Sequence, residues 1–213
     1  MKLQKRECGI KMKIVPYSGG WTDVYINFGD EELYFIISYC TEDNFTDFMR
    51  RLYHLYPNRN DPEDVENEVD YVTEEVGDSV YKLIAWKTEF TWDEEGAYSK
   101  WYLERRANED TEFDLHIDIL TSRKEDKVYH YVVSYKELCY AVAKGYTEMI
   151  KKHGFMGYHQ AVYSEDVCMR YFLFLKAYAL DSLEMIRIKH FEEKGEGEQS
   201  SLEKELELML FYM

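Results

Sequence analysis

The feature that most constrains the fold is a change of hydrophobic period near residue 134. Over residues 112–119 apolar and polar side chains alternate, which is typical of a strand with one buried and one solvated face. From residue 134 onward the apolar side chains recur every three to four positions, which indicates helices. We therefore predict an α+β fold, in which an antiparallel β-sheet carries two principal helices on one face and is followed by a short C-terminal helix.

The predicted strands fall into two groups, because a helical segment separates a short meander from a longer β region. The segments predicted to be strands are residues 10–16, 21–28, 32–39, 80–92, 97–106, 111–120 and 127–133. Glycine-bearing or polar segments that favour turns separate the strands of the meander and the long strands of the second group.

Five segments are predicted to be helical. They are residues 45–55, 62–76, 134–153, 164–180 and 200–213. The third is the clearest, because Ser134 and Glu137 form a capping box and Gly154 follows as a stop signal. The second follows Asp61 as an N-cap and is lined by valines, which also favour strands, so a strand is the alternative there.

The C-terminal part of the chain is predicted to be an appendage. Residues 192–199 contain two glycines and no apolar residue, as expected for a linker. We predict a single α+β domain over residues 1–191, and an acidic linker with a C-terminal amphipathic helix over residues 192–213. The apolar stripe of that helix needs a surface that covers it, either on its own domain or in a homodimer formed through residues 200–213. The stripe consists of Leu202, Leu206, Met209, Leu210 and Met213.

Charge sets the class of partner. The chain has 42 Asp and Glu against 26 Lys and Arg, which gives a net charge of −16, and it has 20 Tyr. Such a field attracts basic surfaces and repels nucleic acid, and tyrosine is a common anchor of protein interfaces. We expect a basic protein partner, no nucleic acid and no membrane. Because there is no signal peptide and no long apolar run, we expect a cytoplasmic protein with cysteines that are buried thiols.

The sequence contains no phosphate-binding loop, no HExxH and no GxSxG motif. We therefore predict a protein that is not an enzyme and that needs no cofactor and no metal. One alternative stays open. Asp114, His116 and Asp118 lie on one face of a predicted strand, and such residues could serve a small metal-dependent hydrolase. The same three residues would also suit an ordinary solvated strand face.

Four segments between residues 79 and 181 give the chain a family resemblance. They are Trp-Asp-Glu-Glu-Gly at residues 92–96, Trp-Tyr-Leu-Glu-Arg at residues 101–105, Glu-Leu-Cys-Tyr-Ala-Val-Ala-Lys-Gly at residues 137–145 and Gly-Phe-Met-Gly-Tyr at residues 154–158. In these segments the chain resembles bacterial immunity proteins of the polymorphic-toxin type. The resemblance implies a small, acidic, cytoplasmic inhibitor that binds a cognate toxin and masks its active site, without catalytic residues of its own.

These observations predict a non-catalytic, acidic protein-binding module, with an immunity protein that inhibits a basic, nuclease-like toxin as its concrete form. Acidic groups would then take the places of nucleic-acid phosphates in the toxin's groove. The residues predicted to contact the partner come from the second group of strands and from one of its turns. They are Asp93, Glu94, Glu95, Tyr98, Trp101, Tyr102, Asp114, His116 and Asp118.

Overall fold

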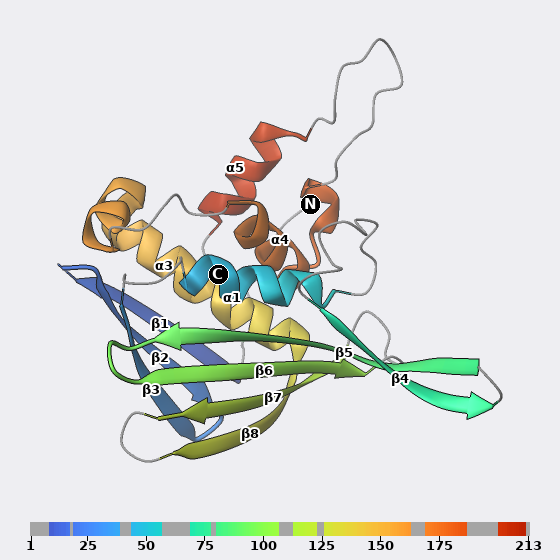
Figure 1. Ribbon diagram of the computed structural model, residues 1–213. Coiled ribbons are helices and arrows are strands. Elements are labelled where there is room, and N and C mark those ends of the chain that lie inside the picture. Colours follow the sequence, from blue (N-terminus) through green and yellow to red (C-terminus); the bar gives the residue numbers. More distant parts are fainter. Residues whose placement is uncertain are drawn as a thin grey trace, which may run out of the picture.

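The computed structural model describes residues 9–17, 19–38, 44–56, 69–77, 80–106, 113–122, 126–162, 169–186 and 200–211. Within these residues the fold is α+β, as predicted, and consists of two antiparallel sheets and four α-helices. Figure 1 shows the strands of the larger sheet running across those of the smaller one, with the helices gathered on one side of both. None of the described helices is long and apolar enough to cross a membrane.

The smaller sheet, sheet A, is the predicted meander. It is formed by β1 (Ile10–Tyr17), β2 (Trp21–Phe28) and β3 (Glu31–Ile37), in that order. The turn between β2 and β3 has only two residues, which requires a backbone conformation that Gly29 supplies with a φ of +64°. Buried and exposed side chains alternate along β1 and β2, so one face of this sheet belongs to the core.

The larger sheet, sheet B, is continuous in chain order. Its strands are β4 (Asp70–Gly77), β5 (Val80–Asp93), β6 (Tyr98–Arg106), β7 (Asp114–Thr121) and β8 (Lys127–Ser134). Each strand pairs antiparallel with the next one, so sheet B is a five-stranded meander. The predicted strands at residues 80–92, 97–106, 111–120 and 127–133 are confirmed.

The prediction of an acidic helix over residues 62–76 is wrong where the structure describes it, because Asp70–Gly77 is strand β4. Pairing with β5 supplies the backbone hydrogen bonds of this segment, and its valines suit a strand. Two register shifts interrupt the pairing, between Val72 and Thr73 and between Glu75 and Gly77. The predicted start of the helix, at Asp61, lies outside the described residues.

The helices are α1 (Asn44–His54), α3 (Tyr135–Val162), α4 (Met169–Ala179) and α5 (Leu202–Leu210), with a short 3-10 helix, η1 (Leu183–Ile186). The prediction for α1 is confirmed, and so is the start of α3. The hydroxyl oxygen of Ser134 accepts a hydrogen bond of 3.4 Å from the backbone N–H of Glu137, as a capping residue does.

The predicted end of the third helix at Gly154 is confirmed, because Gly154 has a non-helical φ of 68° and forms a kink. A second helical segment follows this kink and extends α3 to Val162. The C-terminal helix, predicted to begin at residue 200, has Ser201 as its N-cap. The predicted start of α4, at Ser164, lies outside the described residues.

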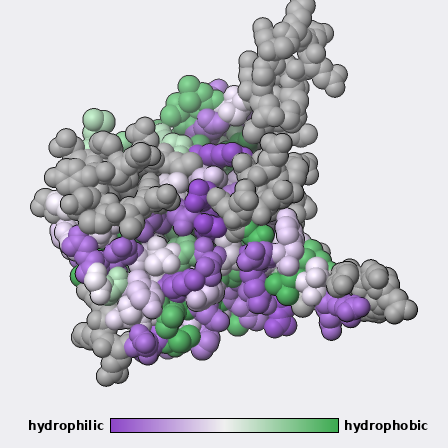
Figure 2. Space-filling view, viewed as in Figure 1, coloured by the Kyte–Doolittle hydropathy of each residue, from purple (hydrophilic) through white to green (hydrophobic). Residues whose placement is uncertain are grey.

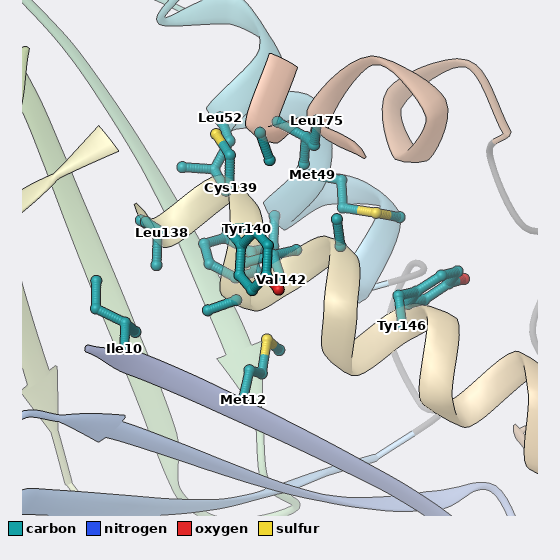
Figure 3. Packing of buried hydrophobic residues seen from close by; sticks show 14 of the residues in the cluster. Ile10, Met12, Met49, Leu52, Leu138, Cys139, Tyr140, Val142, Tyr146 and Leu175 are labelled. Carbon is teal, nitrogen blue, oxygen red and sulfur yellow. The ribbon is translucent and has the colours of Figure 1, made fainter. Parts of the chain in front are cut away.

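Helix α3 is the centre of the core. It lies against β1 on one side and against α4 on the other, while α1 lies between α4 and β5. Figure 3 shows Ile10 and Met12 of β1 on one side of α3, and Met49 and Leu52 of α1 on the other. The approach to β1 is close, because a Cβ atom added to Gly145 would lie 2.8 Å from the carbonyl oxygen of Met12.

Both ends of α1 are anchored by hydrogen bonds from sheet B and α3. At its N-terminus the indole of Trp92 donates to the carbonyl oxygen of Asn44 at 3.2 Å. At its C-terminus the buried hydroxyl of Tyr135 donates to the carbonyl oxygen of Leu52 at 2.7 Å. The guanidinium of Arg105 donates to the carbonyl oxygen of Leu55, the residue after the helix, at 3.0 Å. These bonds hold α1 on the inner face of sheet B.

Of the four cysteines, the structure describes Cys139. Its thiol is free and fully buried in α3, as predicted, and burial raises its pKa well above the ordinary value. Cys8, Cys40 and Cys168 lie outside the described residues.

Helix α5 is docked on the domain, but Met209 is the one described member of the predicted stripe that packs there. Leu208 is fully buried against the core, and Met209 and Phe211 pack beside it. Leu202, Leu206 and Leu210 are exposed instead. Met213 lies outside the described residues, and a homodimer through residues 200–213 stays a prediction.

Candidate partner-binding face

Sheet B has one face in the core and one face in solvent. Phe90, Trp92, Trp101, Leu103 and Ile117 point inward and are buried. The side chains between them point away from the core and form what we call the outer face. On β5 to β8 it consists of Lys87, Glu89, Thr91, Tyr98, Lys100, Tyr102, Glu104, Asp114, His116, Asp118, Leu120, Val128, His130 and Val132.

The outer face is hollowed near the middle of β5, β6 and β7. The hollow has a volume of about 390 Å³. Most of the residues that line it have polar or charged side chains, and the lining consists of Asp70, Lys87, Thr88, Glu89, Tyr102, Leu103, Glu104, His116 and Asp118. Figure 2 shows that hydrophilic side chains predominate over the described surface in this view, with smaller hydrophobic areas among them.

Cross-strand ion pairs order the charges of the outer face. They join Lys87 Nζ to Glu104 Oε2 at 2.9 Å and Lys100 Nζ to Glu89 Oε1 at 2.7 Å. Beside them, the imidazole Nδ1 of His130 lies within hydrogen-bond distance of Asp118 Oδ1, at 2.6 Å. The hydrogen bond to Glu89 is the main reason that the pKa of Lys100 is raised. The face therefore presents alternating charges held in place across the sheet, rather than a uniformly acidic surface.

Both tyrosines that were predicted to contact the partner lie on this face, and the tryptophan that was predicted to do so does not. Tyr98 and Tyr102 of β6 are 41% and 39% exposed. The ring of Tyr102 also lies 4.9 Å from the ammonium of Lys100. Trp101 is fully buried, because odd-numbered residues of β6 point into the core. We therefore leave Trp101 out of the candidate face.

The predicted acidic triplet lies in the turn between β5 and β6, where two of its members build the turn. The carboxylate of Glu94 is buried and accepts a hydrogen bond of 2.5 Å from the hydroxyl of Ser99. The carboxylate of Asp93 accepts a hydrogen bond of 2.8 Å from the backbone N–H of Glu95. Glu95 has a φ of 47° and an exposed side chain. Glu95 is thus the member of the triplet that projects into solvent.

Asp114, His116 and Asp118 lie on the outer face of β7, as predicted, but they do not converge. They follow one another along a single strand at steps of about 7 Å. Asp118 is engaged by His130 of the neighbouring strand. Among the described residues no group of three or more His, Cys, Asp or Glu side chains could hold a metal ion. The alternative of a metal-dependent hydrolase therefore lacks a ligand cluster in this part of the chain.

Sequence reasoning missed Glu89, Lys100, Glu104 and His130, which complete the face. Glu89 and His130 lie beside predicted residues through the register of the sheet, in which Glu89 is opposite Tyr102 and His130 is opposite Asp118. Lys100 and Glu104 lie two residues from Tyr102 on β6 itself, so alternation along the strand places them on the same face. The short turn between β5 and β6 would have been the signal, because turn length sets the register of a hairpin. Comparison of the chain with models of protein families, with curated proteins and with solved structures found no match.

Proposed function

We propose that the chain is a non-catalytic protein-binding module that uses the outer face of sheet B to hold a basic partner protein. Its concrete form is an immunity-type inhibitor of a nuclease-like toxin, as the sequence resemblance implies. The observation that carries the proposal is the outer face itself. It is a broad, exposed sheet surface with a hollow, two exposed tyrosines and ordered charges.

The two tyrosines are the expected anchors of the interface. Tyr98 and Tyr102 lie four residues apart on one strand, so their rings are separated by about 13 Å along the sheet. Tyrosine contributes a large contact area at a small cost in side-chain entropy, and its hydroxyl can bond to a polar partner. The hollow beside Tyr102 can receive a projecting side chain of the partner.

Electrostatics supports a basic partner at two scales. The net charge of −16 produces a long-range field that accelerates encounter with a basic surface. At short range, the carboxylate of Glu89 already bonds to the ammonium of Lys100, and the carboxylate of Asp118 bonds to the imidazole of His130. Arginine or lysine side chains of a partner can compete for these carboxylates, and the groove of a nuclease that binds phosphates is rich in such residues.

The experiment compares two variants with equal net charge. E89K/D118K reverses two carboxylates on the outer face, whereas E148K/E184K reverses two exposed carboxylates on α3 and η1. Each immobilised protein is used to capture partners from a lysate of the source organism at low and high salt, and the retained proteins are identified by mass spectrometry. Thermal unfolding of each variant serves as a folding control.

We expect wild type and E148K/E184K to retain the same basic protein at low salt, and E89K/D118K to lose it. High salt should weaken the capture, because the Debye length falls to about 3 Å at 1 M. Retention of the same protein by all three would contradict the assignment of the outer face. Retention of no protein by wild type at either salt concentration would contradict the proposed function.

A further inference from the structure

Strand β8 is an edge strand of sheet B. Figure 1 shows it as the outermost strand of that sheet, at the lower edge of the view. Its outward side chains include Val128 and Val132, which are 49% and 61% exposed. Its pairing with β7 runs without a register shift from Lys127 to Ser134. The strand is therefore long and regular, and in the described part of the chain no strand pairs with its second edge, where another strand could join the sheet.

Two of the other edge strands, β4 and β1, carry features that discourage strand addition. Strand β4 has two register shifts and the exposed carboxylates of Glu74 and Glu75. Strand β1 has an exposed lysine, Lys13. It also contains Pro16, which is buried and lacks an N–H group. Bulges, prolines and charges are the usual devices that protect an edge. Residues 127–134 contain no proline, no glycine and no carboxylate.

Along β8 the backbone N–H and C=O groups of successive residues point alternately toward β7 and toward the free edge of the sheet. The N–H of Tyr135 donates to the carbonyl oxygen of Phe113 at 2.9 Å, so the hydrogen-bonded pairs between β7 and β8 involve odd-numbered residues. In an antiparallel ladder the pairs alternate, so the N–H and C=O groups of the even-numbered residues point away from β7. The groups available at the free edge are therefore those of Val128, His130 and Val132.

The sequence of this edge is a palindrome, Val128-Tyr129-His130-Tyr131-Val132. An antiparallel pair of identical strands centred on residue 130 places Val128 opposite Val132 of the second copy, and Tyr129 opposite Tyr131 of the second copy. Valine pairs and aromatic pairs are favourable cross-strand neighbours. This register also brings the outward N–H and C=O groups of both strands together. The edge is thus complementary to itself under a two-fold axis.

We propose that two copies of this chain associate through β8, in antiparallel register about His130, so that two five-stranded sheets become one continuous ten-stranded sheet. The proposal goes beyond the proposed function and does not depend on it. The outer face remains open in such a dimer, because the second strand lies beside β8 and not over the sheet. Each dimer would then present two outer faces side by side.

Charge and area determine how such a dimer should behave. Each copy carries a net charge of −16, so two copies repel each other at long range. Residues 127–134 include Lys127 and His130 but no carboxylate, so two copies can approach through this segment with little local repulsion. One strand pair is small compared with the roughly 800 Å² per partner of a standard interface. We therefore expect a weak dimer with a dissociation constant in the micromolar range. Added salt should strengthen it by screening the repulsion between the copies, which is opposite to its effect on a basic partner.

The experiment is sedimentation equilibrium of the full chain from micromolar to millimolar concentration, with two matched double variants. V128K/V132K places like charges opposite each other across the two-fold axis, in both pairs. V128K/V132E changes the same two exposed positions but places an ammonium opposite a carboxylate in both pairs. Melting temperatures confirm that both variants remain folded.

We expect wild type to dimerise, V128K/V132K to remain monomeric and V128K/V132E to dimerise. A wild type that is monomeric at millimolar concentration would overturn the proposal. A dimer that both variants leave intact would also overturn it, because the copies would then associate through another surface, such as the exposed leucines of α5. Equal loss in both variants would refute the register.

A cross-link tests the register independently. In the proposed dimer the two copies of residue 130 form a hydrogen-bonded pair with Cα atoms about 5.5 Å apart, which suits a disulfide. The two copies of residue 132 would be about 13 Å apart along the strands, which is too far. H130C should therefore form a covalent dimer on mild oxidation, and V132C should not. Equal cross-linking of both variants, or of neither, would contradict this register.

Discussion

The buried Lys176 should make the stability of this protein rise with pH between 7 and 10. Its side chain is fully buried in α4. Its ammonium donates to the hydroxyl oxygen of Thr147 at 2.9 Å and to the carbonyl oxygens of Met209 and Phe211 at 3.1 and 2.8 Å. The ring of Phe172 lies 5.5 Å from it. Burial, assisted by the charge of Lys151, lowers its pKa to about 7.

The sign of the effect follows from the direction of this shift. A lysine in the unfolded chain has a pKa of about 10.4, so between pH 7 and 10 the unfolded state binds a proton that the folded state has lost. The free energy of unfolding therefore increases with pH in this window. With a folded-state pKa of about 7, Lys176 contributes about 2 kcal/mol to the increase between pH 7 and 9.

The assay is urea unfolding at several pH values between 7 and 9, for wild type, K176M and K152M. Lys152 is an exposed lysine of α3, so K152M controls for the loss of a lysine at the surface. We expect the difference in unfolding free energy between wild type and K176M to change by about 2 kcal/mol in favour of wild type as the pH rises from 7 to 9. K152M should follow wild type. A difference between wild type and K176M that is constant with pH would refute the lowered pKa.

Three further substitutions test the packing around α3. G145A should lower the free energy of unfolding by about 1–3 kcal/mol, because the added Cβ would lie 2.8 Å from the carbonyl oxygen of Met12. G157A should be neutral or stabilising by up to about 1 kcal/mol, because a Cβ added there would have its nearest neighbour at 3.7 Å. Equal effects of the two substitutions in urea unfolding would argue against the close approach of α3 to β1. Y135F should cost about 1 kcal/mol in the same assay, because the carbonyl oxygen of Leu52 loses its hydroxyl donor, and a variant as stable as wild type would show that this bond does not anchor α1.

The strands other than β4 could be predicted from the sequence, because each of them has a local signal. Alternation of apolar and polar residues along 112–119 predicts β7. The same alternation along β6 places Trp101 on the inward face, and Tyr98 and Tyr102 on the outward face. Strand β4 was missed because its valines suit either structure, and its pairing with β5 is a tertiary contact that decides between them. Local patterns therefore identify an element when one periodicity is dominant.

The candidate face could be predicted only in part, because its members meet through the register of the sheet. The position of Asp118 on the outer face follows from alternation, but its ion pair with His130 requires the pairing of β7 with β8. The burial of Glu94 depends on a turn that folds its carboxylate onto Ser99, which composition does not reveal. The exposed leucines of α5 show the same limit, because that helix docks through Leu208 and Met209 and leaves three leucines of the expected stripe in solvent.

The central claim is that the outer face of sheet B binds a basic protein. The most direct test is the association rate of the captured partner with wild type, E89K/D118K and E148K/E184K, measured by surface plasmon resonance at two salt concentrations. We predict that E89K/D118K associates at least about ten times more slowly at low salt, that E148K/E184K stays close to wild type, and that high salt narrows the difference. Equal rates for all three proteins at low salt would contradict the claim.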